Sequence, residues 1–192
     1  MLLQPVSFEE VLVSHAAPVL AGIKPSALLS FPRKQYPALP ALVKRYARLL
    51  GGKGVALEIV CRCERHRLLF VYRPSLLRER LREPEVRACL CRFGYPGGGF
   101  SPVMRRLRSR LREGNGFPHE VGLFLGYPPR DVLAFLGELP APCRLCGYWK
   151  VYFDEENARR VFALYDRCRA VYREAYRSGR SVPELMELPV SG

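Results

Sequence analysis

The chain has 192 residues, of which 48% are hydrophobic and 26% are charged. This balance is typical of a folded globular protein and excludes a disordered chain, and the length predicts a single domain, 1–192, with a full-sized core. The formal net charge of +13 favours anionic partners, namely nucleic acid, anionic lipid or a phosphorylated small molecule. The alternative is that the surplus arginines form only a solvated surface.

The sequence favours neither a membrane span nor a signal peptide. The longest nearly uncharged apolar stretch covers 11–23, contains His15 and Pro18, and is too short for a membrane span. Neither a basic leader nor a small-residue cleavage site marks a signal peptide, so we expect a cytosolic (cytoplasmic) protein. Its seven cysteines are then expected to be free thiols, metal ligands or redox groups rather than disulfides.

The first half of the chain is predicted to contain two helices and a hairpin. Ser7 and Glu10 have capping-box spacing and begin a helix toward Gly22, which Pro18 kinks or breaks. Residues 26–40 contain three prolines and no clear period, which favours a loop, and a second helix covers 39–50. Alternating polarity over 55–64, a polar turn and the run 68–72 predict an antiparallel hairpin.

The second half is predicted to begin with helices, at 74–82, 85–93 and 102–112, and to end with alternating strands and helices. The fully apolar run 121–125 favours a central strand covered on both faces. A helix over 129–139, a strand over 148–153 and a last helix capped by Asp154 follow, and the tail 181–192 is expected to be loosely held. This order predicts a parallel crossover. The expected fold is α/β (or α+β): a mixed sheet of about four or more strands with helices on both faces.

His119 and Glu120 are the candidate catalytic residues. They are adjacent titratable groups at the entrance of the predicted central strand, where they could act as an acid–base pair or as metal ligands. The alternative is that one of them binds neighbouring backbone amides.

The candidate ligand-binding residues are Tyr127, Arg130, Tyr148 and Lys150. Lys150 lies between Tyr148 and Tyr152 on one face of its predicted strand, where it could bind an anion or a carbonyl compound. Alternatively, it is a surface lysine whose stem covers apolar neighbours. Tyr127 and Arg130 follow the predicted central strand, at the end where open parallel sheets bind ligands.

A metal site is a further candidate. Cys143 and Cys146 form a CxxC motif, which is half of a zinc or cluster site, and Cys61 and Cys63 on one strand face could complete it. The alternative is inert, buried thiols.

The densest basic run, Arg105–Arg112 in the sequence, could contact phosphates. No zinc-finger, helix-turn-helix or aromatic-platform motif accompanies it, so nucleic acid is the less favoured partner.

Four strings in the sequence resemble a bacterial family known only as domain of unknown function number 3793. They are HAAPVLAGIK (15–24), FPHEVGLFLGYP (117–128), GYWKVY (147–152) and YDRCR (165–169). Members of this family often carry Cys directly after the first His, where this chain has Ala16, so any role of that thiol is absent here. The resemblance implies no activity and transfers no site residue.

The sequence therefore favours a cytosolic protein that binds an anionic small molecule or cofactor. One alternative is an enzyme that uses His119 and Glu120 as its acid–base pair; another is a basic nucleic-acid-binding or structural protein. No motif identifies the cofactor, and nothing in the sequence indicates the oligomeric state.

Overall fold

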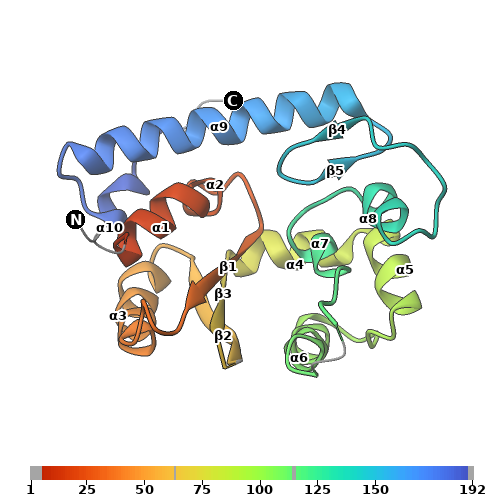
Figure 1. Cartoon of the computed structure of the whole chain (residues 1–192), viewed down its shortest axis with the longest axis horizontal. Coiled ribbons are helices and arrows are strands. Elements are labelled where there is room, and N and C mark those ends of the chain that lie inside the picture. The colour runs from red at the N-terminus through yellow and green to blue at the C-terminus, as the bar shows by residue number, and fades with distance from the viewer. Residues whose placement is uncertain (1–5, 63, 114–115, 190–192) are drawn as a thin grey trace.

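The computed structural model describes residues 6–62, 64–113 and 116–189 (Figure 1). The first elements in the chain are α1 (Phe8–His15), α2 (Ala17–Leu20), β1 (Ser26–Pro32), α3 (Leu39–Gly51), β2 (Ala56–Arg62) and β3 (His66–Tyr72). There follow α4 (Pro74–Arg82), α5 (Pro84–Arg92), α6 (Phe100–Arg110), α7 (Val121–Phe124), α8 (Pro129–Phe135), β4 (Leu145–Cys146), β5 (Lys150–Val151), α9 (Glu155–Arg177) and α10 (Val182–Leu185). None of the described helices is long and apolar enough to cross a bilayer.

The main sheet has three antiparallel strands in the order β1-β3-β2. The predicted hairpin is confirmed as β2 and β3. The predicted loop 26–40 is wrong over its first part, which forms β1. Ala27, Leu29 and Phe31 alternate toward the core there, and Pro32 is tolerated because β1 is an edge strand.

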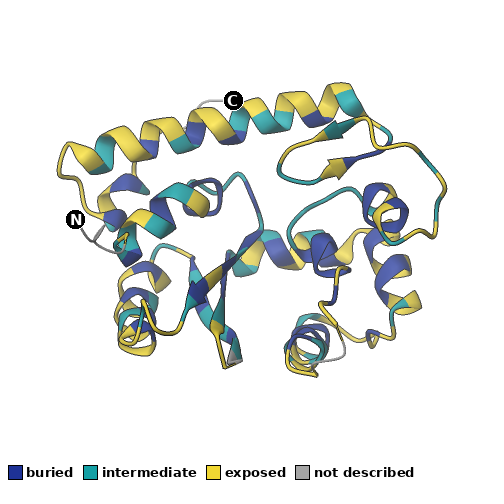
Figure 2. Ribbon diagram, in the orientation of Figure 1, coloured by how far each residue is buried: buried dark blue, intermediate teal, exposed yellow. Residues whose placement is uncertain are grey.

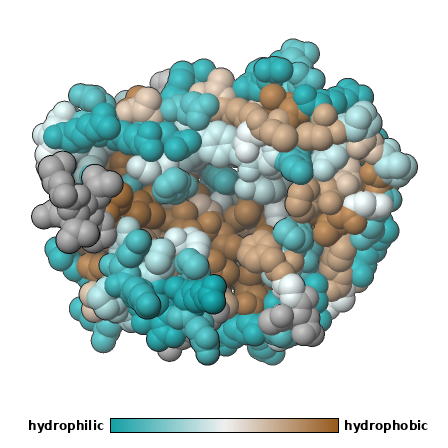
Figure 3. All heavy atoms as spheres, viewed as in Figure 1, coloured by the Kyte–Doolittle hydropathy of each residue, from teal (hydrophilic) through white to brown (hydrophobic). Residues whose placement is uncertain are grey.

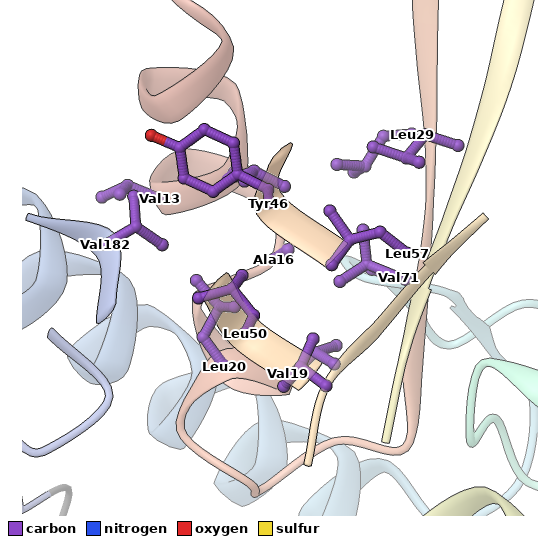
Figure 4. Packing of buried hydrophobic residues seen from close by; sticks show 14 of the residues in the cluster. Val13, Ala16, Val19, Leu20, Leu29, Tyr46, Leu50, Leu57, Val71 and Val182 are labelled. Carbon is purple, nitrogen blue, oxygen red and sulfur yellow. The ribbon is translucent and has the colours of Figure 1, made fainter. Parts of the chain in front are cut away.

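The α+β class is confirmed, with helices packed on both faces of a sheet that is smaller than expected. On β3, Leu69 and Val71 belong to a core with α1, α2, α3 and α9, whereas Phe70 and Tyr72 belong to a second core with α4 to α8. This split follows from the two-residue period of a strand. Figure 4 shows the first core, where Leu29, Leu57 and Val71 from the three strands cluster with Val19 and Leu20 of α2.

The predicted central strand at 121–125 is wrong: this segment is the short helix α7. Its burial was predicted correctly, since the side chains of Val121, Leu123 and Phe124 are all buried. A short, wholly apolar run does not distinguish a buried strand from a buried helical turn. Gly126, with φ at +86°, ends the turn and lets the Tyr127 amide bond Gly122 O at 2.9 Å.

The parallel crossover is also wrong. Of the predicted strand 148–153, Lys150–Val151 alone is extended and paired, and its partner is the antiparallel β4 in a separate two-stranded sheet. Asp131 of α8 explains the short strand: its Oδ1 accepts hydrogen bonds from Tyr152 N at 2.9 Å and Phe153 N at 3.3 Å. These amides bind a carboxylate instead of a neighbouring strand.

The first and last described helices meet on α9, which crosses one side of the molecule (Figure 1) and packs on α1, α2 and α10. Figure 2 shows α9 exposed on its outer side and buried toward the helices below. The Ser7–Glu10 capping box and the Asp154 cap are both confirmed. The tail 181–192 differs from its expectation over its described part: a second capping box begins α10, whose Val182 and Leu185 are buried in the first core.

Candidate functional site

A cavity of about 530 Å³ lies at the centre of the fold. Its wall is formed by residues of α1, β1, the turn after α7, the β4–β5 turn and α9. Figure 3 shows apolar side chains gathered in a hollow on this side of the molecule, below α9. The cavity is within the size range of small-molecule sites.

Lys24 is the unusual residue of this cavity. It follows α2, where Gly22 turns the chain with φ at +81° and Pro18 O accepts the amides of Ile23 and Lys24 at 2.9 and 3.0 Å. Arg73 Nε fixes the end of α2 by donating to Val19 O at 2.7 Å. These contacts place Lys24 inside the fold and not on its surface, with 7% of the residue exposed.

The Lys24 ammonium group is surrounded by aromatic rings. Its Nζ lies 5.4 Å from the ring centroid of Tyr127, 6.0 Å from that of Tyr148 and 5.6 Å from that of Tyr165. Within the described ranges it makes no ion pair and no hydrogen bond. Burial lowers the pKa of Lys24 to about 8, because the charged form has lost water without gaining a counter-ion.

Arg169 of α9 supplies a second positive charge to the cavity wall. Its Nε donates to Ser14 O at 2.7 Å, and its Nη1 donates to the Tyr148 hydroxyl at 3.1 Å. That hydroxyl donates in turn to Asp166 Oδ1 at 2.8 Å. Burial is the main cause that raises the pKa of Tyr148. The network fixes Arg169 between α1 and the β4–β5 turn.

The charged side chains that line the cavity are basic, and one of them, Arg169, also pairs with Asp166, whose Oδ1 lies 3.6 Å from Arg169 Nη1. His15 joins Lys24 and Arg169 in the wall, and its pKa is lowered first by partial burial and then by Arg169 and Arg173. In the part of the chain that the structure describes, no Asp or Glu lines this cavity. A region with positive groups and no lining carboxylate favours the charged form of an anion.

A smaller, more apolar pocket of about 300 Å³ adjoins the cavity. The two share Leu28, Leu125 and Tyr127, and Tyr127 stacks on Trp149 with ring centroids 5.2 Å apart. Lys150 lines the smaller pocket, and its Nζ lies 5.6 Å from the Phe135 ring centroid. The two adjoining spaces therefore differ in chemistry: basic side chains line the cavity, and mostly apolar side chains line the smaller pocket.

The four predicted ligand-binding residues are only partly brought together. Tyr127 and Tyr148 both line the central cavity, and Lys150 lines the adjoining pocket. Arg130 lines neither of them; it is exposed, and its guanidinium lies 4.0 Å above the Phe153 ring centroid.

His119 and Glu120 have separate environments. The His119 ring is exposed beside Phe117 and Phe135 and lines the apolar pocket. Glu120 is buried, and its Oε1 accepts from Arg110 Nε at 3.0 Å and from the Tyr95 hydroxyl at 3.2 Å. These contacts favour a structural role for Glu120.

The Glu120→Gln variant is expected to lower the free energy of unfolding by about 1–2 kcal/mol, because the buried end of a charged hydrogen bond to Arg110 is lost. Urea denaturation measures this. Glu113→Gln is the matched control, since Glu113 is a more exposed partner of the same arginine, and it is expected to change stability by less than ~0.5 kcal/mol. If Glu120→Gln is as stable as the parent, Glu120 has no structural role and becomes available for chemistry.

Cys143 and Cys146, the predicted metal ligands, lie close together. Their Sγ atoms lie 3.6 Å apart on the surface. Residues 6–62, 64–113 and 116–189 contain no group of three or more His, Cys, Asp or Glu side chains that could hold a metal ion. Cys61 lies in β2, and Cys63 lies outside the described residues.

Most of the basic run at 105–112 is engaged within the fold. These contacts join Arg106 to Glu113, Arg108 to both carboxylate oxygens of Glu58, Arg110 to Glu120 and Arg112 to Val60 O. Arginines that are bound internally are less available to phosphates, so this helix offers weak support for nucleic-acid binding.

Lys24, His15 and Arg169 were missed as site residues by sequence reasoning. All three lie in strings that carry the family resemblance: 15–24 contains His15 and Lys24, and 165–169 contains Arg169. The strings 117–128 and 147–152 add Tyr127 and Tyr148, so each of the four strings supplies at least one residue of the cavity wall.

A family-level comparison matches the chain over residues 12–186 to the family described as protein of unknown function (DUF3793). No curated protein and no solved structure matches the chain.

Proposed function

We propose that this chain, which belongs to the family of proteins of unknown function DUF3793, binds an anionic small molecule in its central cavity. Lys24 and Arg169 would contact the anionic group, and Tyr127 and Tyr148 would contact the rest of the ligand. The adjoining pocket would accept an apolar part of the same molecule.

The observation that carries this proposal is the buried Lys24. A lysine residue that is 7% exposed, with no carboxylate partner in the described chain, lowers the stability of the unliganded fold when its ammonium group is charged. An anion in the cavity would supply the missing counter-charge. Residues that lower stability without an evident folding role are typical of binding and catalytic sites.

Support for the two other functions is weaker. An acid–base pair of His119 and Glu120 needs both groups to reach one substrate, whereas Glu120 is bound to Arg110 and Tyr95. Nucleic-acid binding needs free cations, whereas the basic helix directs most of its arginines to internal partners.

Calorimetric titration with matched ligands tests the proposal. Benzoate and phenyl phosphate are the anionic probes, and benzamide and phenol are their neutral counterparts. We expect the two anions to bind and to raise the melting temperature, because a ligand that binds the folded state stabilises it by mass action. The neutral counterparts are expected to bind at least about tenfold more weakly, which corresponds to ~1.4 kcal/mol.

Two variants locate the binding. Lys24→Met is expected to abolish anion binding, whereas Lys34→Met, which removes an exposed lysine, is expected to leave it unchanged. Equal affinity for benzoate and benzamide, or full anion binding by Lys24→Met, would contradict the proposal.

A further inference from the structure

We infer that Lys24 is a nucleophile that condenses with the carbonyl group of an aldehyde or ketone carrying a carboxylate or a phosphate. This inference rests on the proposed function, since the anionic group of such a compound would occupy the same cavity. It adds that the ligand is held by a covalent imine bond to the Lys24 side chain.

The first argument is the placement of the amine. Lys24 is buried at the wall of a cavity large enough for a small molecule, and its Nζ has no hydrogen-bond or ion-pair partner among the residues described. Once deprotonated, its lone pair is therefore free to react.

The second argument is the contrast with the other lysines. The chain has four more, of which Lys53 forms an ion pair with Glu187 at 2.6 Å. Lys34, Lys44 and Lys150 are exposed. An exposed lysine is almost fully protonated at neutral pH, whereas a desolvated lysine retains a reactive neutral fraction. With a pKa of about 8, Lys24 is neutral in about a tenth of the molecules at pH 7.

The reaction needs no other reagent. The neutral amine adds to the carbonyl carbon, forming a carbon–nitrogen bond, while the carbonyl π electrons move to oxygen and a proton follows. The resulting carbinolamine loses its hydroxyl group as water, and the two hydrogens of the amine leave with that oxygen. Nothing is oxidised or reduced.

The cavity contains groups suited to such a ligand. Burial raises the pKa of Tyr127 to about 12, so its hydroxyl stays protonated and can donate to the carbonyl or carbinolamine oxygen. Arg169, fixed by Ser14 and Tyr148, is a suitable partner for a carboxylate or phosphate. The ligand class is therefore a small carbonyl compound with one anionic group.

Reductive trapping tests the inference on the unmodified protein. Pyruvate and pyridoxal 5′-phosphate are the anionic carbonyl probes, acetone and pyridoxal are their neutral counterparts, and cyanoborohydride reduces any imine to a stable secondary amine. Peptide mapping by mass spectrometry then gives the rate at each of the five lysines. With at least one anionic probe at pH 7, we expect Lys24 to be modified at least about tenfold faster than Lys34 or Lys44. Whichever anionic probe reacts identifies carboxylate or phosphate as the preferred group.

The outcomes separate the covalent step from simple binding. Lys24→Met removes the amine and is expected to lose the trapped adduct, whereas Lys34→Met, which removes an exposed lysine, is expected to keep it. If Lys24 is modified no faster than the exposed lysines by either anionic probe while benzoate still binds, the imine inference is wrong and the proposed function stands. If benzoate does not bind either, both are wrong. Faster modification by acetone and pyridoxal than by the anionic probes would also overturn the inference, because it would show that the site does not select ligands with an anionic group.

Discussion

Replacing Lys24 with Met is expected to make the protein more stable at pH 7. Met has a similar length and no charge, so it occupies similar space beside the three tyrosine rings and removes the ammonium group that lies near them. The expected gain in the free energy of unfolding is about 2–3 kcal/mol. The variant would lose the binding site and gain stability.

The effect of Lys24 on the free energy of unfolding depends on pH, because the pKa of this lysine differs between the folded and the unfolded state. Burial lowers the pKa of Lys24 to about 8 in the folded state, below its unfolded value of about 10.4. Below pH 8 the lysine is charged in both states, and the folded protein carries the full penalty of the buried charge. Between about pH 8 and 10.4 the unfolded state holds more protons than the folded state, so stability rises with pH.

Urea denaturation of both proteins from neutral to alkaline pH measures this effect. The stability of the parent relative to Lys24→Met should rise by about 3 kcal/mol across the interval, so that the two converge at high pH. Lys34→Met is the control, because the exposed lysine should produce no such change. A constant difference between parent and Lys24→Met would show that Lys24 is not buried as a cation.

Replacing Asp131 with Ala is expected to lower the free energy of unfolding by about 3–4 kcal/mol. The Asp131 carboxylate is 4% exposed and accepts from Trp149 Nε1 at 2.8 Å and from the amides of Tyr152 and Phe153. Its loss leaves these donors without their acceptor and frees the β4–β5 turn, which carries Tyr148 of the cavity wall.

Two measurements check the Asp131 prediction. Urea denaturation gives the loss of stability, and Trp149, the single tryptophan of the chain, reports on the turn by its fluorescence. We expect a red shift of the emission for Asp131→Ala, a smaller loss of stability for Asp131→Asn, which retains one acceptor, and little change for the exposed neighbour Arg130→Ala. An unchanged emission and stability in Asp131→Ala would contradict the role of this carboxylate.

Local patterns in the sequence predicted local structure well. The capping residues Ser7 and Asp154 and the β2–β3 hairpin each depend on neighbours along the chain, and all are confirmed. The segment 121–125 was assigned the wrong element because an all-apolar run carries no period. The segment 148–153 was assigned too long a strand because its amides bind Asp131, which lies 21 and 22 residues away.

The cavity was harder to predict than the fold. Tyr127 and Tyr148 were selected from the sequence, but for a parallel sheet that does not exist in the described chain. Lys24 resembled any other lysine, because its burial depends on residues from the β4–β5 turn, the turn after α7 and α9. One signal was present: Lys24 ends the first of four strings that carry the family resemblance, and each string reaches the same cavity.

The protonation of Lys24 tests the central claim most directly. With carbon-13 at the lysine Cε positions, the chain gives five signals, and the one absent from Lys24→Met identifies Lys24. An NMR pH titration should give a pKa of about 8 for Lys24 in the free protein. A saturating concentration of benzoate should raise this pKa by at least about one unit, since an anion that prefers the charged amine must raise its proton affinity by the same factor. An ordinary lysine pKa in the free protein, or a lowered pKa that benzoate leaves unchanged, would contradict an anion site at Lys24.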